Sequence, residues 1–118
     1  MRKYTILDTP IHDVKKVMIV MIVDLKDEIN MFLYDTLDDV PSIEDYSFET
    51  LQEAEELFNR EFLRDRDSKV SWIYIQNPME GCQEDIIEPV RVKSINTHAP
   101  KWGTYEKLIE GHWVDIKF

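Results

Sequence analysis

The residues best suited to chemistry in this chain are three histidines and one cysteine, and they are scattered along it. His12, His98 and His112 form no His-x-His or His-x-x-x-His pair. Together with Cys82 they could meet around zinc only if the fold brought distant ligands together. We expect separate loop or strand histidines, with no metal site and no cofactor.

Cys82 lies in the segment EGCQED, where its near neighbours Glu80, Glu84 and Asp85 are acidic. A nucleophilic thiol needs a nearby base or a helix N-terminus to lower its pKa, and carboxylates have the opposite effect. We therefore expect an ordinary loop cysteine. A single cysteine forms no internal disulfide, which favours a cytoplasmic location.

The common catalytic motifs are missing from the sequence. It contains no glycine-rich phosphate loop, no G-x-S-x-G elbow and no H-E-x-x-H helix, and its glycines are only Gly81, Gly103 and Gly111. Adjacent carboxylates such as Asp38 and Asp39 do not face each other across a cleft, as a glycosidase pair must. We assign no catalytic residues and lean against an enzyme.

The charge of the chain is strongly negative and unevenly distributed. The net charge is −10, and between Asp38 and Glu61 there are nine acids and a single base, Arg60. Such a field repels nucleic acid and attracts basic proteins. We predict a non-catalytic, inhibitor-like protein that docks a basic protein partner. The acidic residues expected to bind it are Asp38, Asp39, Glu44, Asp45, Glu49, Glu53 and Glu56.

Trp102, in the segment APKWGTY, is a further candidate for the partner-binding surface. Aromatic side chains dominate interface energetics, so an exposed loop tryptophan could anchor a partner. The alternative, slightly favoured, is that Trp102 folds back to cover a face of the sheet.

A second function hypothesis places a small-molecule-binding or enzymatic site between the loops 77–89 and 96–103. Its pocket would be lined by Cys82, Asp85 and His98. Long loops in a small domain often carry function. Mimicry of nucleic acid by the acidic residues is a third, weaker option.

The segment VMIVMIV, residues 17–23, predicts a central strand. Five of its seven residues are Val or Ile, which favour strands, and both faces are apolar. It is far shorter than the roughly 20 residues of a membrane helix, and the N-terminus does not resemble a signal peptide. We expect no membrane association, and a second strand at 29–37.

The clearest predicted helix is TLQEAEELFNREF, residues 50–62. Thr50 and Glu53 have the spacing of a capping box. An apolar stripe at helical spacing is formed by Leu51, Ala54, either Leu57 or Phe58, and Phe62. This helix should cover one face of the sheet.

The remaining segments complete an α+β pattern. We predict loops at 38–47, 77–89 and 96–103, a solvated connector at 64–69, strands at 70–76 and 90–95, and a final hairpin turning near Glu110-Gly111.

The predicted fold is a single α+β domain spanning residues 1–118. It has one antiparallel sheet of about five to six strands, one main helix on one face, and the order β-β-α-β-β-β-β. The second face would be covered by loops, by the final hairpin or by another copy of the chain. A monomer is favoured and a homodimer is possible. The acidity and architecture are compatible with small cytosolic inhibitors of toxic enzymes, such as immunity proteins, but no motif in the chain carries a resemblance to a known family.

Overall fold

The computed structural model describes residues 1–7, 16–63 and 70–118. The predicted connector at 64–69 and the loop or strand assignment of His12 lie outside the described residues. The chain divides into two compact units, Met1–Gln76 and Asn77–Phe118, and each is described here by itself. The single domain over residues 1–118 stays a prediction.

Within the described residues, the element order is β-β-β-β-α-β-β-β-β and not the predicted β-β-α-β-β-β-β. The elements are β1 (Arg2–Ile6), β2 (Ile19–Leu25), β3 (Glu28–Tyr34), β4 (Glu44–Phe48), α1 (Leu51–Phe62), β5 (Ile73–Ile75), β6 (Val90–Lys93), β7 (Lys101–Ile109) and β8 (His112–Ile116). The prediction of an α+β fold is confirmed.

The N-terminal unit is an antiparallel sheet with the strand order β4-β3-β2-β1-β5. The central strand is β2, which agrees with the prediction made from its two apolar faces. Val20, Ile22 and Val23 are fully buried, and Met21 is 1% exposed. At about 25 cal/mol per Å² of apolar surface, these buried side chains are a major source of stability for the unit.

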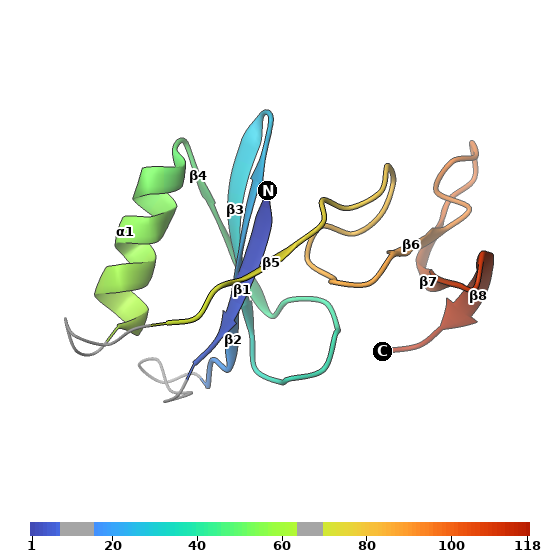
Figure 1. Ribbon diagram of the computed structural model, residues 1–118. Coiled ribbons are helices and arrows are strands. Elements are labelled where there is room, and N and C mark those ends of the chain that lie inside the picture. The colour runs from blue at the N-terminus through green and yellow to red at the C-terminus, as the bar shows by residue number, and fades with distance from the viewer. Residues whose placement is uncertain (8–15, 64–69) are drawn as a thin grey trace. The chain divides into compact units, whose positions relative to one another are not determined.

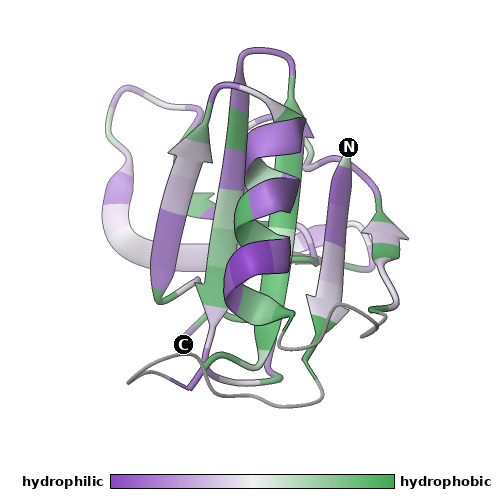
Figure 2. Cartoon of the chain, turned by 90° about the vertical axis from the view of Figure 1, so that its left-hand side faces the viewer, coloured by the Kyte–Doolittle hydropathy of each residue, from purple (hydrophilic) through white to green (hydrophobic). Residues whose placement is uncertain are grey.

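The helix α1 lies on one face of this sheet, against β3 and β4 (Figure 1). Its N-cap is Thr50, whose Oγ1 accepts a hydrogen bond from the backbone N–H of Glu53 at 3.2 Å, as the capping box predicts. The buried residues of the helix, Ala54 and Phe58, pack into a core cluster with Val20, Ile22, Met31 and Leu33 among others. Figure 2 shows the polar outer side of α1 in front of the apolar central strands.

The opposite face of β2 is also buried. Ile19 is 6% exposed and Met21 1%, and the Tyr34 hydroxyl donates to the sulfur of Met21 at 3.8 Å. The segment 35–43, which joins β3 to β4, leaves the sheet on this side, away from α1 (Figure 1). A loop of the same unit therefore lies on the side that the helix does not cover.

The strand β1 was not predicted. It pairs with β2 and β5, and it places Arg2 and Lys3 inside the protein at 3% and 5% exposure. Arg2 Nε donates to the carbonyl of Gln76 at 2.8 Å, so the charged group has a partner. The sequence alone does not indicate that these two consecutive basic residues lie in a buried strand, because the residues that pair with them are distant in sequence.

The C-terminal unit contains its own antiparallel sheet, in the order β6-β7-β8. The prediction of a single sheet is therefore wrong. Pro78 and Pro89 lie in the segment of chain between β5 and β6. The β7–β8 hairpin turns at Glu110 and Gly111, as predicted, with φ of 49° and 81°. Two positive φ values are typical of a type I′ turn.

Two predicted loops are shorter than expected. The loop 38–47 ends at β4, a polar strand at the edge of the sheet, where charged residues are common because they prevent aggregation. The loop 96–103 ends at β7, which begins at Lys101, and the register of β6 against β7 shifts between Val92 and Lys93. The strands predicted at 29–37, 70–76 and 90–95 are β3, β5 and β6 with shorter bounds.

Candidate acidic interaction surface

Acidic residues gather where the β2–β3 turn meets the start of α1. The turn is Lys26-Asp27, and Glu49 precedes the N-cap of α1. The two segments line a shallow hollow of about 360 Å³. Its lining residues are Asp24, Leu25, Lys26, Asp27, Glu28, Ile29, Phe48 and Glu49. Four acidic residues and one lysine line the hollow, and the N-terminal ammonium of Met1 donates to the backbone carbonyl of Asp24 at 2.6 Å. Because the acids still outnumber these cations, the hollow is suited to a cationic side chain.

The carboxylates of this hollow are available to a partner. Asp27, Glu28 and Glu49 are exposed, and Asp24 is half-buried. Among the residues that the structure describes, none of the four makes an ion pair. We call Asp24, Asp27, Glu28 and Glu49 the acidic hollow.

Two predicted partner-binding residues of the helix lie near the acidic hollow. Glu53 and Glu56 are exposed on the N-terminal half of α1, one turn apart, and the Gln52 side-chain amide donates to Glu56 Oε1 at 2.9 Å. Their neighbour Glu55 is different. It turns toward β1, where its Oε1 lies 2.7 Å from Lys3 Nζ, so its charge is already compensated.

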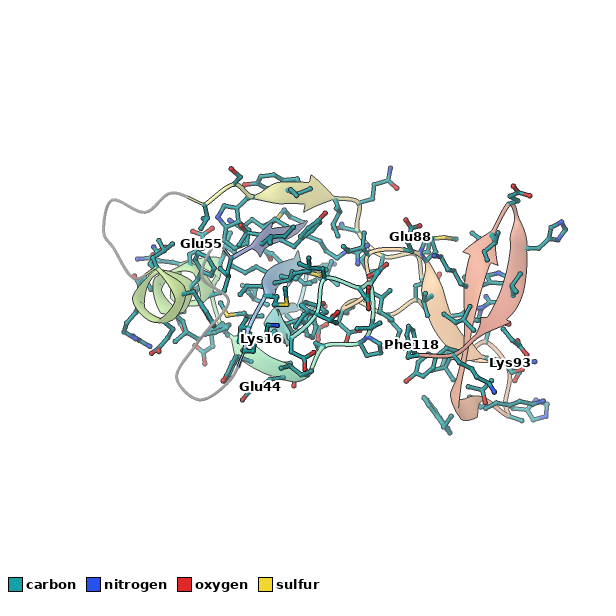
Figure 3. The ribbon with its side chains drawn as sticks, turned by 90° about the horizontal axis from the view of Figure 1, so that it is seen from below. Lys16, Glu44, Glu55, Glu88, Lys93 and Phe118 are labelled. Carbon is teal, nitrogen blue, oxygen red and sulfur yellow. The ribbon has the colours of Figure 1, made fainter. Side chains whose placement is uncertain are left out.

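The acids of β4 do not share one face. Glu44 pairs with Leu33, whose side chain packs under α1, whereas Asp45 pairs with Phe32 on the opposite face. Glu44 accepts a hydrogen bond from the Tyr46 hydroxyl at 3.0 Å. Figure 3 shows Glu44 on the β4 side of the sheet and Glu55 on α1. Because side chains alternate along a strand, adjacent acids on β4 cannot act as a pair.

Asp38 and Asp39 are exposed in the segment that leaves the sheet away from α1 (Figure 1). Together with Asp45 they form a second set of acids, which we call the far-side acids. The seven predicted acidic residues are therefore not one patch. Glu49 lines the acidic hollow, Glu53 and Glu56 lie on the N-terminal half of α1, Glu44 lies at the other end of β4, and the far-side acids are separate.

Trp102 is 73% exposed and belongs to the C-terminal unit. It lies in the register shift between β6 and β7, next to Gly103, whose φ of 87° suits a glycine. Its exposure argues against the prediction that it covers a sheet face. Its role in partner binding stays a prediction.

The residues of the predicted small-molecule pocket are all in the C-terminal unit. Cys82 and Asp85 are half-buried, His98 is exposed, and Cys82 forms an isolated bridge with Arg91 of β6. The two loops meet at Gly81, where an added Cβ would lie 3.3 Å from the Asn96 side-chain oxygen. A pocket lined by these three residues stays a prediction.

A second hollow, of about 690 Å³, lies along the β7–β8 hairpin of the C-terminal unit. Its lining includes Tyr105 and Phe118, whose rings meet edge to face with centroids 5.2 Å apart. Its titratable lining residues are Tyr105, Asp115 and Lys117.

Within residues 1–7, 16–63 and 70–118, no group of three or more His, Cys, Asp or Glu side chains could hold a metal ion. No helix in the same ranges is long and apolar enough to cross a bilayer.

Sequence reasoning missed Asp24, Asp27 and Glu28 as site residues. The signal was present, since the connector DLKDEIN carries three acids and one lysine between two apolar strands. Its proximity to Glu49 depends on the pairing of β3 with β4, which composition does not show. No protein-family model, curated protein or solved structure matches the chain.

Proposed function

We propose that this chain is a non-catalytic binding protein that docks a basic protein partner at the acidic hollow. The observation that carries the proposal is a concave surface lined by four acidic residues, none of which makes an ion pair within the described residues. A lysine or arginine projecting from the partner would enter the hollow. The protein's inhibitor-like role and its cytoplasmic location, which the single cysteine favours, are parts of the same proposal.

Electrostatic steering supplies the physical mechanism. Complementary charge raises association rates more than it raises affinity, and added salt suppresses the effect. Glu53 and Glu56 extend the negative field from the hollow along the exposed side of α1. The far-side acids add to the net charge but would not contact a partner seated in the hollow.

The test compares two triple variants that each remove three negative charges. The hollow variant is Asp27→Asn, Glu28→Gln, Glu49→Gln, and the matched control is Asp38→Asn, Asp39→Asn, Asp45→Asn. All six residues are exposed, so both variants should fold. Each tagged protein is used to capture partners from a lysate of its source cells at about 0.05 M and about 0.5 M salt.

We expect the wild-type protein and the control to retain a basic protein at low salt, and the hollow variant to lose it. At high salt, the wild-type protein and the control should also lose the basic protein. Equal capture by the two variants, or no salt-sensitive basic protein at all, would contradict the proposal.

A further inference from the structure

The two edges of the β6-β7-β8 sheet differ in how they are covered. The edge at β6 is partly covered by its own unit, since Cys82 bridges to Arg91 and the Gln83 N–H donates to the Val90 carbonyl at 2.7 Å. The edge strand β8 has β7 as its neighbour on one side. Among the described residues, no hydrogen bond to its other side is found. An uncovered strand edge is a template for another strand.

The register of the hairpin fixes which groups of β8 point outward. Ile109 pairs with His112 across the two-residue turn, so the backbone groups of His112, Val114 and Ile116 face β7. Those of Trp113 and Asp115 face away from β7, and those of Lys117 do so if the extended path continues. β8 ends at Ile116, and beyond it the ring of Phe118 contacts Tyr105, which pairs with Ile116, so the chain stays beside β7 past the end of the strand.

The side chains along this edge are sorted by face. Val114, Ile116 and Phe118 lie on one face, where Val114 is 43% exposed and Phe118 52%. Asp115 and Lys117 alternate with them and lie on the other. One short strand therefore carries an apolar row and an acid followed by a base two residues later.

We infer that β8 pairs antiparallel with β8 of a second copy of this chain, with Ile116 opposite Ile116. Charge complementarity selects this register. It places Asp115 opposite Lys117 of the partner copy, twice, in positions where both residues have outward backbone groups. A shift that centres the pairing on Asp115 would place two carboxylates opposite each other, which is destabilising.

The same register matches the apolar face. Val114 would lie opposite Phe118 of the second copy, and the paired strands would join the two apolar rows into one. Asp115 Oδ2 already lies 2.7 Å from Lys93 Nζ, and its second oxygen remains for the partner's Lys117 (Figure 3 labels Lys93 and Phe118). The paired segment is short, so the dimer is weak and forms at high protein concentration.

The test is a charge exchange followed by sedimentation equilibrium of residues 1–118. Lys117→Asp alone places two carboxylates opposite each other in the paired strands, and Asp115→Lys alone places two ammonium groups opposite each other. We expect each variant to dimerise about tenfold more weakly than the wild-type protein. An equal mixture of the two should recover dimers, since both contacts between unlike copies are attractive.

Two further variants control for folding and for bulk charge. Lys101→Asp makes the same charge change on β7 and should leave dimerisation unchanged, because Lys101 is not on the β8 edge. Lys117→Pro removes an outward N–H without disturbing the bonds to β7, and should give monomers with an unchanged circular dichroism spectrum. A wild-type protein that stays monomeric would overturn the inference, and β8 would then be open to a different extended segment. A dimer unaffected by Lys117→Asp, or a mixture that fails to recover dimers, would overturn it equally.

Discussion

Lys3 is a charged residue held inside the N-terminal unit by one carboxylate and two aromatic rings. Its Nζ lies 2.7 Å from Glu55 Oε1, 4.5 Å from the centre of the Trp72 ring and 5.9 Å from that of Tyr74. The Lys3 side chain is 7% exposed, whereas that of Glu55 is 43% exposed. Water can therefore solvate the Glu55 carboxylate if the ion pair is broken, but it reaches the Lys3 ammonium poorly.

This asymmetry predicts unequal effects of removing either partner. Glu55→Ala leaves a buried ammonium without its carboxylate and should lower the free energy of unfolding by about 2 kcal/mol. Lys3→Met keeps the aliphatic stem and leaves a carboxylate that water can reach, so its cost should be below about 1 kcal/mol. Urea denaturation measures both.

Glu56→Ala, one residue along α1, serves as the control and should change stability by less than about 0.5 kcal/mol. If Lys3→Met proved more destabilising than Glu55→Ala, the electrostatic account of this pair would be wrong.

In the C-terminal unit, Asp115 raises the pKa of Lys93 above its ordinary 10.5, by a hydrogen bond first and by its charge second. A raised lysine pKa means that the ion pair stabilises the fold below pH 10.5 and stops doing so as pH rises through the folded-state pKa. Asp115→Asn should therefore return the pKa of Lys93 toward 10.5. The substitution should destabilise the unit at neutral pH, but not at a pH above the folded-state pKa of Lys93.

Titration of the Lys93 side-chain carbon by NMR checks this prediction. An unchanged Lys93 titration in Asp115→Asn would rule out the ion pair in solution.

At the scale of elements, the predictions that held depend on local signals. The helix follows from Thr50, Glu53 and the stripe of Ala54 and Phe58, which all lie within three turns of chain. The strand β2 follows from an apolar run that only a position between two layers can satisfy. Neither inference needs knowledge of a distant residue.

The elements that were missed depend on distant partners. Lys3 can be buried in β1 because it pairs with Glu55, which lies 52 residues away in sequence. β4 forms, despite its acidic residues, because its backbone pairs with that of β3. The face of the sheet on which each β4 side chain lies, which differs between Glu44 and Asp45, follows from that register alone. The sequence therefore indicated acidic binding residues but not which of them share a surface.

The N-cap of α1 gives a direct test of the local signal. Thr50→Ala removes the acceptor of the Glu53 N–H and should cost about 1 kcal/mol, whereas Thr50→Ser retains the hydroxyl and should cost much less. Thermal unfolding followed by circular dichroism in the two variants compares them. Equal losses would show that the hydroxyl does not cap the helix.

At the scale of the whole molecule, the net charge of −10 favours encounter with basic proteins wherever they approach. The local arrangement decides where they dock. Four acidic residues line the acidic hollow, while the far-side acids are exposed on the 35–43 segment and on β4. Pairing through β8, by contrast, would combine backbone hydrogen bonds and an apolar row with only two ion pairs, so it should depend less steeply on salt than docking at the acidic hollow.

The central claim is that a basic partner docks specifically at the acidic hollow, and is not attracted only by the overall negative charge of the protein. The most direct measurement is the association rate of the captured partner, by stopped flow, across a range of salt concentrations. We predict that the hollow variant associates about tenfold more slowly than the wild-type protein at low salt, with a shallower salt dependence, while the far-side control stays close to the wild-type rate. Equal slowing in both triple variants would show that net charge alone attracts the partner, and would contradict the account.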